Sequence, residues 1–233
     1  MFRDRAEAGR RLARRLEPYR TADPVVLGIA RGGVIVAAEI ARHLKAPLDV
    51  LVVRKLGHPS NPEYGLGAVT ESGDVMIDDE RLADSGLARA DLESTIRRET
   101  AEARRRVGAY RGGLAPIEVS GRTVIVVDDG MATGGTVRAA VRDLRARRPL
   151  RIVLAIAVAP SESVRILGAA GDDVCVLETP SNFSAVGEFF ESFEPVEDDA
   201  VMKALAASRR PKLSSSHGLV DERNSSVRDP RRR

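Results

Sequence analysis

The segment Val124–Thr136 constrains this chain most, because it joins a strand pattern to a helix pattern through an unusual set of side chains. Four apolar residues, VIVV, predict a buried strand, and two adjacent aspartates follow it, Asp128 and Asp129. Small residues then lead into TVRAAVRDLRARR, which has the pattern of a helix. Ligands of open α/β sheets bind where strands end in this way. The segment therefore predicts a ligand site at the carboxyl edge of a sheet.

The side chains of this segment suit a sugar phosphate. The two carboxylates repel each other unless a cation or hydroxyl donors engage them, and a ribose 2′,3′-diol supplies two such donors. Five small or hydroxyl-bearing residues let backbone N–H groups approach a phosphate at the start of the helix: Ala132, Thr133, Gly134, Gly135 and Thr136. A plain strand-turn-helix is the alternative. A P-loop and a GxGxxG dinucleotide fingerprint are both absent.

Strand and helix patterns alternate along most of the chain. Their alternation predicts an α/β fold with an open, mainly parallel five-stranded sheet that helices cover on both faces. Two further helices are predicted at the ends, over 5–17 and 196–207. The predicted strands cover 24–33, 48–56, 122–130, 151–160 and 173–180.

The segment Val124–Thr136 resembles the motif with which type I phosphoribosyltransferases bind 5-phosphoribosyl-1-pyrophosphate (PRPP). The resemblance covers roughly residues 5–207, since strand order and other loops also fit. RKLGHPSNPEYGLGAV and PSNFSAVGEFFESF resemble a bacterial group of this family with undefined substrates. The resemblance implies the type I fold with a small hood. It also implies that Asp128 and Asp129 hold the ribose hydroxyls while Ala132–Thr136 wrap the 5′-phosphate.

A second loop, Ala30-Arg31-Gly32-Gly33, resembles the pyrophosphate loop of the family. It joins a predicted strand to a predicted helix start, and Arg31 can form charge-assisted hydrogen bonds to phosphate oxygens. A simple turn is the alternative. Because the family often strains a peptide bond at this point, we expect a cis bond near Ala30-Arg31.

Arg54 and Lys55 end the second predicted strand, where the resemblance places basic residues on the pyrophosphate. A solvated pair at a strand end is the alternative. Residues 57–67 are rich in Gly, Pro, Asn and Ser, so we predict a loop. This loop resembles the mobile lid that excludes water from the site.

The implied reaction transfers the phosphoribosyl group of PRPP to a nitrogenous base or another nitrogen nucleophile and releases pyrophosphate. Bond breaking at the anomeric carbon runs ahead of bond making, so the protein must mainly position groups and stabilise charge. The resemblance implies four catalytic groups: Arg54, Lys55, Asp128 and Asp129. It implies Mg²⁺ as the cofactor, held mainly by PRPP and not directly by protein ligands.

The acceptor is less well defined than the donor. Hypoxanthine-guanine enzymes carry an Asp where this chain has Ala132, so a 6-oxopurine is disfavoured as the acceptor. We expect the base to stack on Phe183 and Phe189 in the segment 180–193, with core packing as the alternative for these rings. The helical stretch 79–110 is the other candidate for the hood, or for the surface of a homodimer.

Charge and hydropathy bound the other possibilities. The formal net charge of the chain is +3. Residues 208–233 hold eight Lys or Arg and three Asp or Glu, so the net charge is +5 for this tail and −2 for the rest of the chain. We therefore expect a phosphoribosyltransferase domain over 1–207, with a helical insertion at 79–110, and a disordered basic tail over 208–233. Nucleic acid is disfavoured as a partner. No membrane-length apolar run occurs, which predicts a cytoplasmic protein.

Two rival functions share the sugar-phosphate site. A PRPP- or nucleotide-sensing regulator would keep the motif and present a basic surface on the folded part, whereas here the folded part is net negative. A phosphorylase or hydrolase acting at the same site is the other rival.

Overall fold

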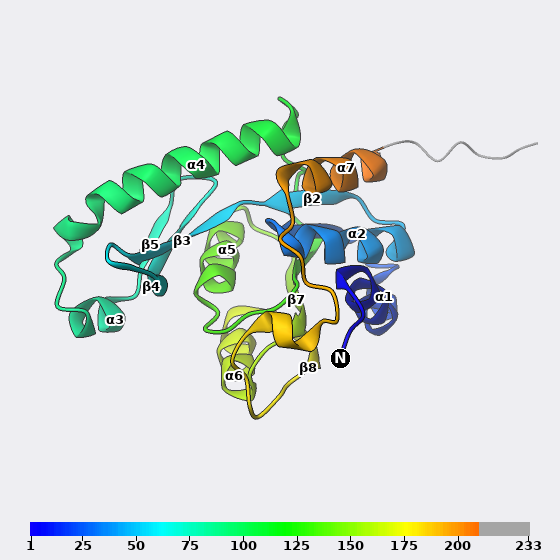
Figure 1. The fold of residues 1–233 in the computed structure, drawn as a ribbon. Helices are drawn as coiled ribbons and strands as arrows, with labels where there is room; N and C mark the ends of the chain where they lie inside the picture. The colour runs from blue at the N-terminus through cyan, green and yellow to red at the C-terminus, as the bar shows by residue number, and fades with distance from the viewer. Residues whose placement is uncertain (210–233) are drawn as a thin grey trace, which may run out of the picture.

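Five parallel strands form the main sheet of the protein, in the order β2-β1-β6-β7-β8. The computed structural model describes residues 1–209 (Figure 1). The predicted α/β fold with a parallel five-stranded sheet is confirmed. The main-sheet strands are β1 (Val25–Ile29), β2 (Leu48–Leu51), β6 (Thr123–Asp128), β7 (Arg151–Val158) and β8 (Asp173–Glu178).

Helices cover both faces of this sheet because its central strands are apolar on both sides. Val26, Ile125 and Val153 pack towards α1, α2 and α7, whereas their neighbours Val124 and Leu154 pack towards α5 and α6. Figure 1 shows the two helical layers on opposite sides of the strands. The layers contain α1 (Arg5–Arg15), α2 (Gly32–Leu44) and α7 (Asp198–Arg209), and α5 (Gly135–Ala146) and α6 (Ser161–Ala170).

The second predicted strand, 48–56, is two strands in the structure. The chain leaves the main sheet after β2 and enters an antiparallel three-stranded sheet, β3-β4-β5. The predicted loop over 57–67 is wrong, since this stretch forms most of the β3–β4 hairpin. Gly57 makes the hairpin's tight pairing possible, because a Cβ there would overlap the carbonyl of Pro62. The bounds are β3 (Val53–His58), β4 (Asn61–Thr70) and β5 (Val75–Ile77).

The predicted helical stretch 79–110 is largely helical and interrupted. It contains α3 (Asp79–Asp84), a 3₁₀ turn at Arg89–Leu92, and α4 (Glu93–Arg111). Both helices pack on the three-stranded sheet, and Figure 1 shows α4 reaching from this sheet towards α7. The small sheet and its helices therefore form a second lobe beside the main sheet.

The end of the folded region differs slightly from the prediction. Helix α7 continues to Arg209, so Ser208 and Arg209 are helical, and residues 210–233 of the predicted tail lie outside the described residues. Strand β8 is half-buried along its length because it is an edge strand. Among the helices described, none combines the length and the apolar character needed to cross a membrane.

Candidate functional site

Two loops meet at the carboxyl ends of β1 and β6, which are neighbours in the main sheet. A Cβ on Gly32 would overlap Oδ2 of Asp129, and one on Gly33 would stand 2.5 Å from the carbonyl oxygen of Val127. Only glycine allows the two loops to approach so closely. The structure therefore brings the predicted pyrophosphate loop against the predicted ribose-binding aspartates. The expected cis peptide bond between Ala30 and Arg31 is confirmed.

The two aspartates are held differently. Oδ1 of Asp128 accepts a hydrogen bond from the backbone N–H of Asp129 at 3.0 Å, and Oδ2 of Asp129 accepts one from Nε of Arg5 at 2.6 Å. Desolvation first, and then the negative charge of Asp129, raise the pKa of the Asp128 carboxyl well above its ordinary value. Burial disfavours the charged form of Asp128, and the neighbouring carboxylate adds repulsion that the guanidinium of Arg5 only partly offsets.

The predicted 5′-phosphate loop runs from Ala132 to Thr136 and begins helix α5. Gly134 has a positive φ of 75°, and no side chain caps the helix. Among the described residues, the first backbone N–H groups of α5 therefore have no side-chain oxygen as a cap. Ala132 and Thr133 are exposed. The carbonyl of Ala132 accepts a hydrogen bond from the Ser163 hydroxyl at 2.5 Å, which ties the loop to α6. Uncapped N–H groups at a helix start are suited to binding an anion.

Arg31 points away from the pair of aspartates. Its guanidinium Nη1 lies 3.5 Å from Oε2 of Glu197 and 3.9 Å from Oδ1 of Asp198, at the beginning of α7. Helix α2, which starts at Gly32, also lacks a side-chain cap. The backbone of this loop, and not the Arg31 side chain, is therefore what the structure presents beside Asp129.

Arg54 and Lys55 lie on opposite faces of β3, as neighbours in a strand do. Arg54 donates from Nε and Nη2 to Oε2 of Glu99 on α4, at 2.9 and 2.7 Å. Lys55 shares the face of Val53, which packs in the same cluster as β6 and α5, and its Nζ donates to the carbonyl of Glu63 at 2.5 Å. The predicted basic pair is thus divided, and only Lys55 faces the side of the aspartate strand.

The rings predicted to stack on the base lie near the loop that follows β6, and they contact each other. Phe183 and Phe189 stack with centroids 5.7 Å apart and an interplanar angle of 11°. Between them in the chain, Val186 packs so closely on Gly130 that a Cβ there would overlap its side chain. The segment 180–193 therefore borders the site, and one face of each ring is already occupied.

Arg5 is a site residue that sequence reasoning missed. It lies 124 residues from its partner Asp129, and its own surroundings in the sequence indicate only an amphipathic helix. No local pattern pointed to it. Within residues 1–209, no three His, Cys, Asp or Glu side chains gather in a way that could hold a metal ion. Surface hollows of about 510, 950 and 630 Å³ lie away from the two loops.

Comparison with known proteins places this chain in a family. A model of the phosphoribosyl transferase domain matches residues 4–182. Two Mycobacterium tuberculosis proteins, from strains CDC 1551 and H37Rv, are each 41% identical over 210 residues, covering 90% of this chain and 47% of theirs. Both names contain the words phosphoribosyl transferase, and neither states a substrate. The chain belongs to the phosphoribosyl transferase family.

A solved structure shares this fold. The crystal structure of TT1426 from Thermus thermophilus shares 40% sequence identity and a TM-score of 0.74, and covers 89% of this chain and 98% of that one. The likeness to TT1426 therefore extends over nearly all of that protein. In contrast, this chain spans about half the length of the curated relatives it matches.

The close approach of the two loops predicts that Gly33→Ala destabilises the fold. The new Cβ would meet backbone on both sides, 2.5 Å from the Val127 oxygen and 3.0 Å from Cα of Asp128, so neither neighbour can yield cheaply. We expect a loss of about 1–3 kcal/mol in the free energy of unfolding, measured by urea denaturation. Gly168→Ala in α6 is the control, because nothing lies within 4 Å of its Cβ and alanine favours helix. Equal stability of Gly33→Ala and the wild type would contradict the assigned contact.

Proposed function

We propose that this protein binds PRPP at the two loops and transfers its phosphoribosyl group to a nitrogen nucleophile, releasing pyrophosphate. The observation that carries the proposal is the meeting of Asp128 and Asp129 with an uncapped helix start at one edge of the sheet. One side offers oxygens for a diol and the other offers N–H groups for a phosphate. Membership of the phosphoribosyl transferase family supports the same assignment.

The residues have separate roles in this proposal. Asp128 and Asp129 accept the ribose hydroxyls, and their charge favours the positive charge that grows on the sugar. The loop Ala132–Thr136 holds the 5′-phosphate, and the backbone from Ala30 to Gly33 faces the pyrophosphate. Mg²⁺, when bound, neutralises charge on the pyrophosphate oxygens.

Lys55 is the cationic side chain that we place on the pyrophosphate. We therefore expect Lys55→Ala to lower pyrophosphate release by about 10–100-fold, since one charge-assisted contact to the leaving group is lost. Arg54→Ala is the matched control, because the Arg54 guanidinium forms an ion pair with Glu99, which is largely buried. It should lower the melting temperature more than it lowers the rate per folded molecule. The reverse pattern would show that Arg54, and not Lys55, faces the substrate.

The acceptor is found by measuring pyrophosphate release from PRPP with Mg²⁺ and a panel of bases, amines and amides. We expect turnover with at least one acceptor, and slow turnover with hypoxanthine and guanine because Ala132 stands where the 6-oxopurine enzymes have an acid. Tight PRPP binding without turnover of any acceptor would favour a PRPP sensor on the same fold. Pyrophosphate release in the absence of any acceptor, with ribose 5-phosphate as the other product, would favour a hydrolase.

A further inference from the structure

Arg5 is fixed in place before any ligand binds. It is the first residue of α1, and the preceding Asp4 caps that helix by accepting a hydrogen bond from the Glu7 backbone N–H at 2.7 Å. The Arg5 guanidinium lies 3.8 Å from the centroid of the Phe193 ring, and Nη1 donates to the carbonyl of Glu194 at 2.9 Å. Its side chain is only 12% exposed. Stacking and hydrogen bonding together define the direction of its Nε donor.

That donor meets Asp129. Nε of Arg5 is 2.6 Å from Oδ2, and both side chains are largely shielded from water. Removing one partner would therefore leave the other charge shielded and uncompensated, which costs more than breaking an exposed ion pair. The same Oδ2 lies against Gly32. The contact thus fixes the rotamer of Asp129 and turns one oxygen towards the pyrophosphate loop.

The other oxygens of the two aspartates remain available. Oδ1 of Asp128 accepts the Asp129 N–H, and Oδ2 of Asp129 accepts from Arg5. Among the described residues, no N–H group or hydroxyl donates to Oδ2 of Asp128 or Oδ1 of Asp129, although the two carboxyls lie within hydrogen-bonding reach of each other. Each carboxylate thus keeps one acceptor oxygen, and two acceptors match the two hydroxyl donors of a cis-diol.

We propose that Arg5 is a positioning residue, which orients Asp129 beside Asp128 so that the pair can accept the 2′,3′-diol of the sugar. This inference rests on the proposed function, because it concerns the same sugar-phosphate site. Arg5 touches Asp129 and not the reacting atoms. Its effect should therefore depend on whether the ligand has both hydroxyls.

The test compares ribose 5-phosphate with 2-deoxyribose 5-phosphate, which lacks one of the two donors, by calorimetric titration of the full chain. We expect the wild type to bind ribose 5-phosphate with about tenfold higher affinity. A difference of this size corresponds to the loss of one hydrogen bond to a charged group. Arg5→Ala should reduce this preference to less than about threefold. Arg5→Lys, which retains a cation, should restore part of it.

Arg11→Ala is the matched control, since Arg11 is on the same helix, pairs with Glu7 at 2.5 Å and lies over the Phe2 ring, away from the loops. It should keep the wild-type preference. Thermal unfolding checks each variant, and Arg5→Gln, which keeps a donor without the charge, replaces Arg5→Ala if that variant does not fold. Its preference should also fall.

Two outcomes overturn the inference in different ways. A folded Arg5→Ala or Arg5→Gln with an unchanged preference, or with tighter binding of ribose 5-phosphate, shows that Arg5 does not prepare the pair for the diol. The proposed function survives that result. If the wild type binds neither sugar phosphate nor PRPP, the proposed function and the inference both fail.

Discussion

Replacing Asp128 and Asp129 together by asparagine should lower the affinity for PRPP by at least about 100-fold. Each carboxylate has one oxygen available to a hydroxyl donor, and a hydrogen bond to a charged group contributes about 1.5–3 kcal/mol, so losing two removes most of the sugar recognition. The amide of Asn is uncharged and can also turn a donor towards the diol. Calorimetric titration of Mg-PRPP into both proteins measures the change. Unaltered affinity in the double variant would contradict the assigned sugar site.

The stability of the single variants checks that this loss is not an unfolding effect. The folded-state pKa of Asp128 is raised above its ordinary value of 3.8. Its contribution to stability is therefore full below that ordinary pKa and is lost as the pH rises through the folded-state pKa. At pH 7, which is above the ordinary pKa, Asp128 therefore works against folding. Asp128→Asn should raise the melting temperature at pH 7 and lose that advantage near pH 4, whereas Asp129→Asn, which breaks the pair with Arg5, should not raise it.

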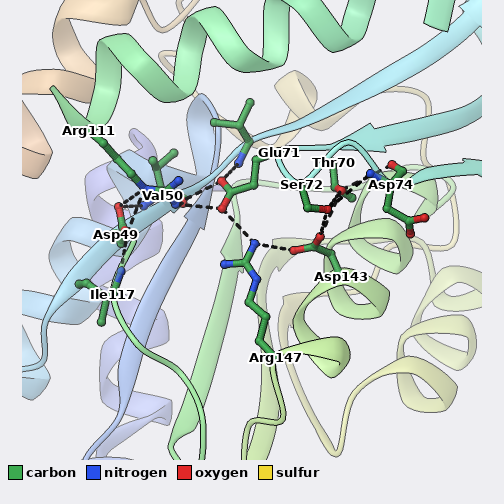
Figure 2. A network of polar contacts seen from close by, with 11 residues as sticks. Asp49, Val50, Thr70, Glu71, Ser72, Asp74, Arg111, Ile117, Asp143 and Arg147 are labelled. Atoms are coloured by element: carbon green, nitrogen blue, oxygen red, sulfur yellow. Dashed lines mark hydrogen bonds and ion pairs between the residues drawn. The ribbon is translucent and has the colours of Figure 1, made fainter. Parts of the chain in front are cut away.

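Arg111→Ala should lower the free energy of unfolding by about 3–5 kcal/mol, because it removes one partner of a buried ion-pair network. This loss is larger than we expect for a substitution at the surface. Figure 2 shows its guanidinium between Asp49 on β2 and Glu71, which follows β4. Nε lies 3.2 Å from Oδ2 of Asp49, and Nη2 lies 3.1 Å from Oε1 of Glu71 and 2.8 Å from the carbonyl of Val50. Removing the cation would leave two buried carboxylates without their shared partner.

This network also explains why the effect should be large. Glu71 accepts a further hydrogen bond from Arg147 at 3.0 Å, and Arg147 pairs with Asp143 of α5 at 2.6 Å. The polar contacts therefore join the second lobe both to β2 of the main sheet and to α5, which covers that sheet (Figure 2). Arg145→Ala is the control, because its pair with Asp172 is exposed and such a pair is worth less than about 1 kcal/mol. Urea denaturation compares the two variants. A similar small loss in both would mean that the buried network does not hold the lobes together.

The main sheet could be predicted from the sequence because most of its strands are largely apolar runs that are followed by small or polar residues. Val124–Asp128 and Val25–Ile29 have this pattern, and the loops that follow them carry the candidate site. The β3–β4 hairpin could not be predicted in the same way. Its glycines, including Gly57 and Gly67, are typical of a loop, yet they permit close strand pairing that only the fold reveals.

Side-chain partners were harder to predict than strands. Arg54 and Lys55 are adjacent in sequence, and the alternation of β3 places one against α4 and the other on the opposite face. Arg5 and Asp129 are separated by most of the chain, so no spacing rule connects them. The proposed PRPP site could be predicted from local sequence, whereas the contacts between its side chains depend on tertiary packing.

The most direct test of the central claim is a crystal structure of this chain with Mg-PRPP. We predict that the 5′-phosphate lies on the backbone N–H groups of Ala132–Thr136, and that the ribose 2′- and 3′-hydroxyls donate to Asp128 and Asp129. PRPP bound with its phosphate away from this loop, or with its ribose hydroxyls facing other residues, would contradict the account.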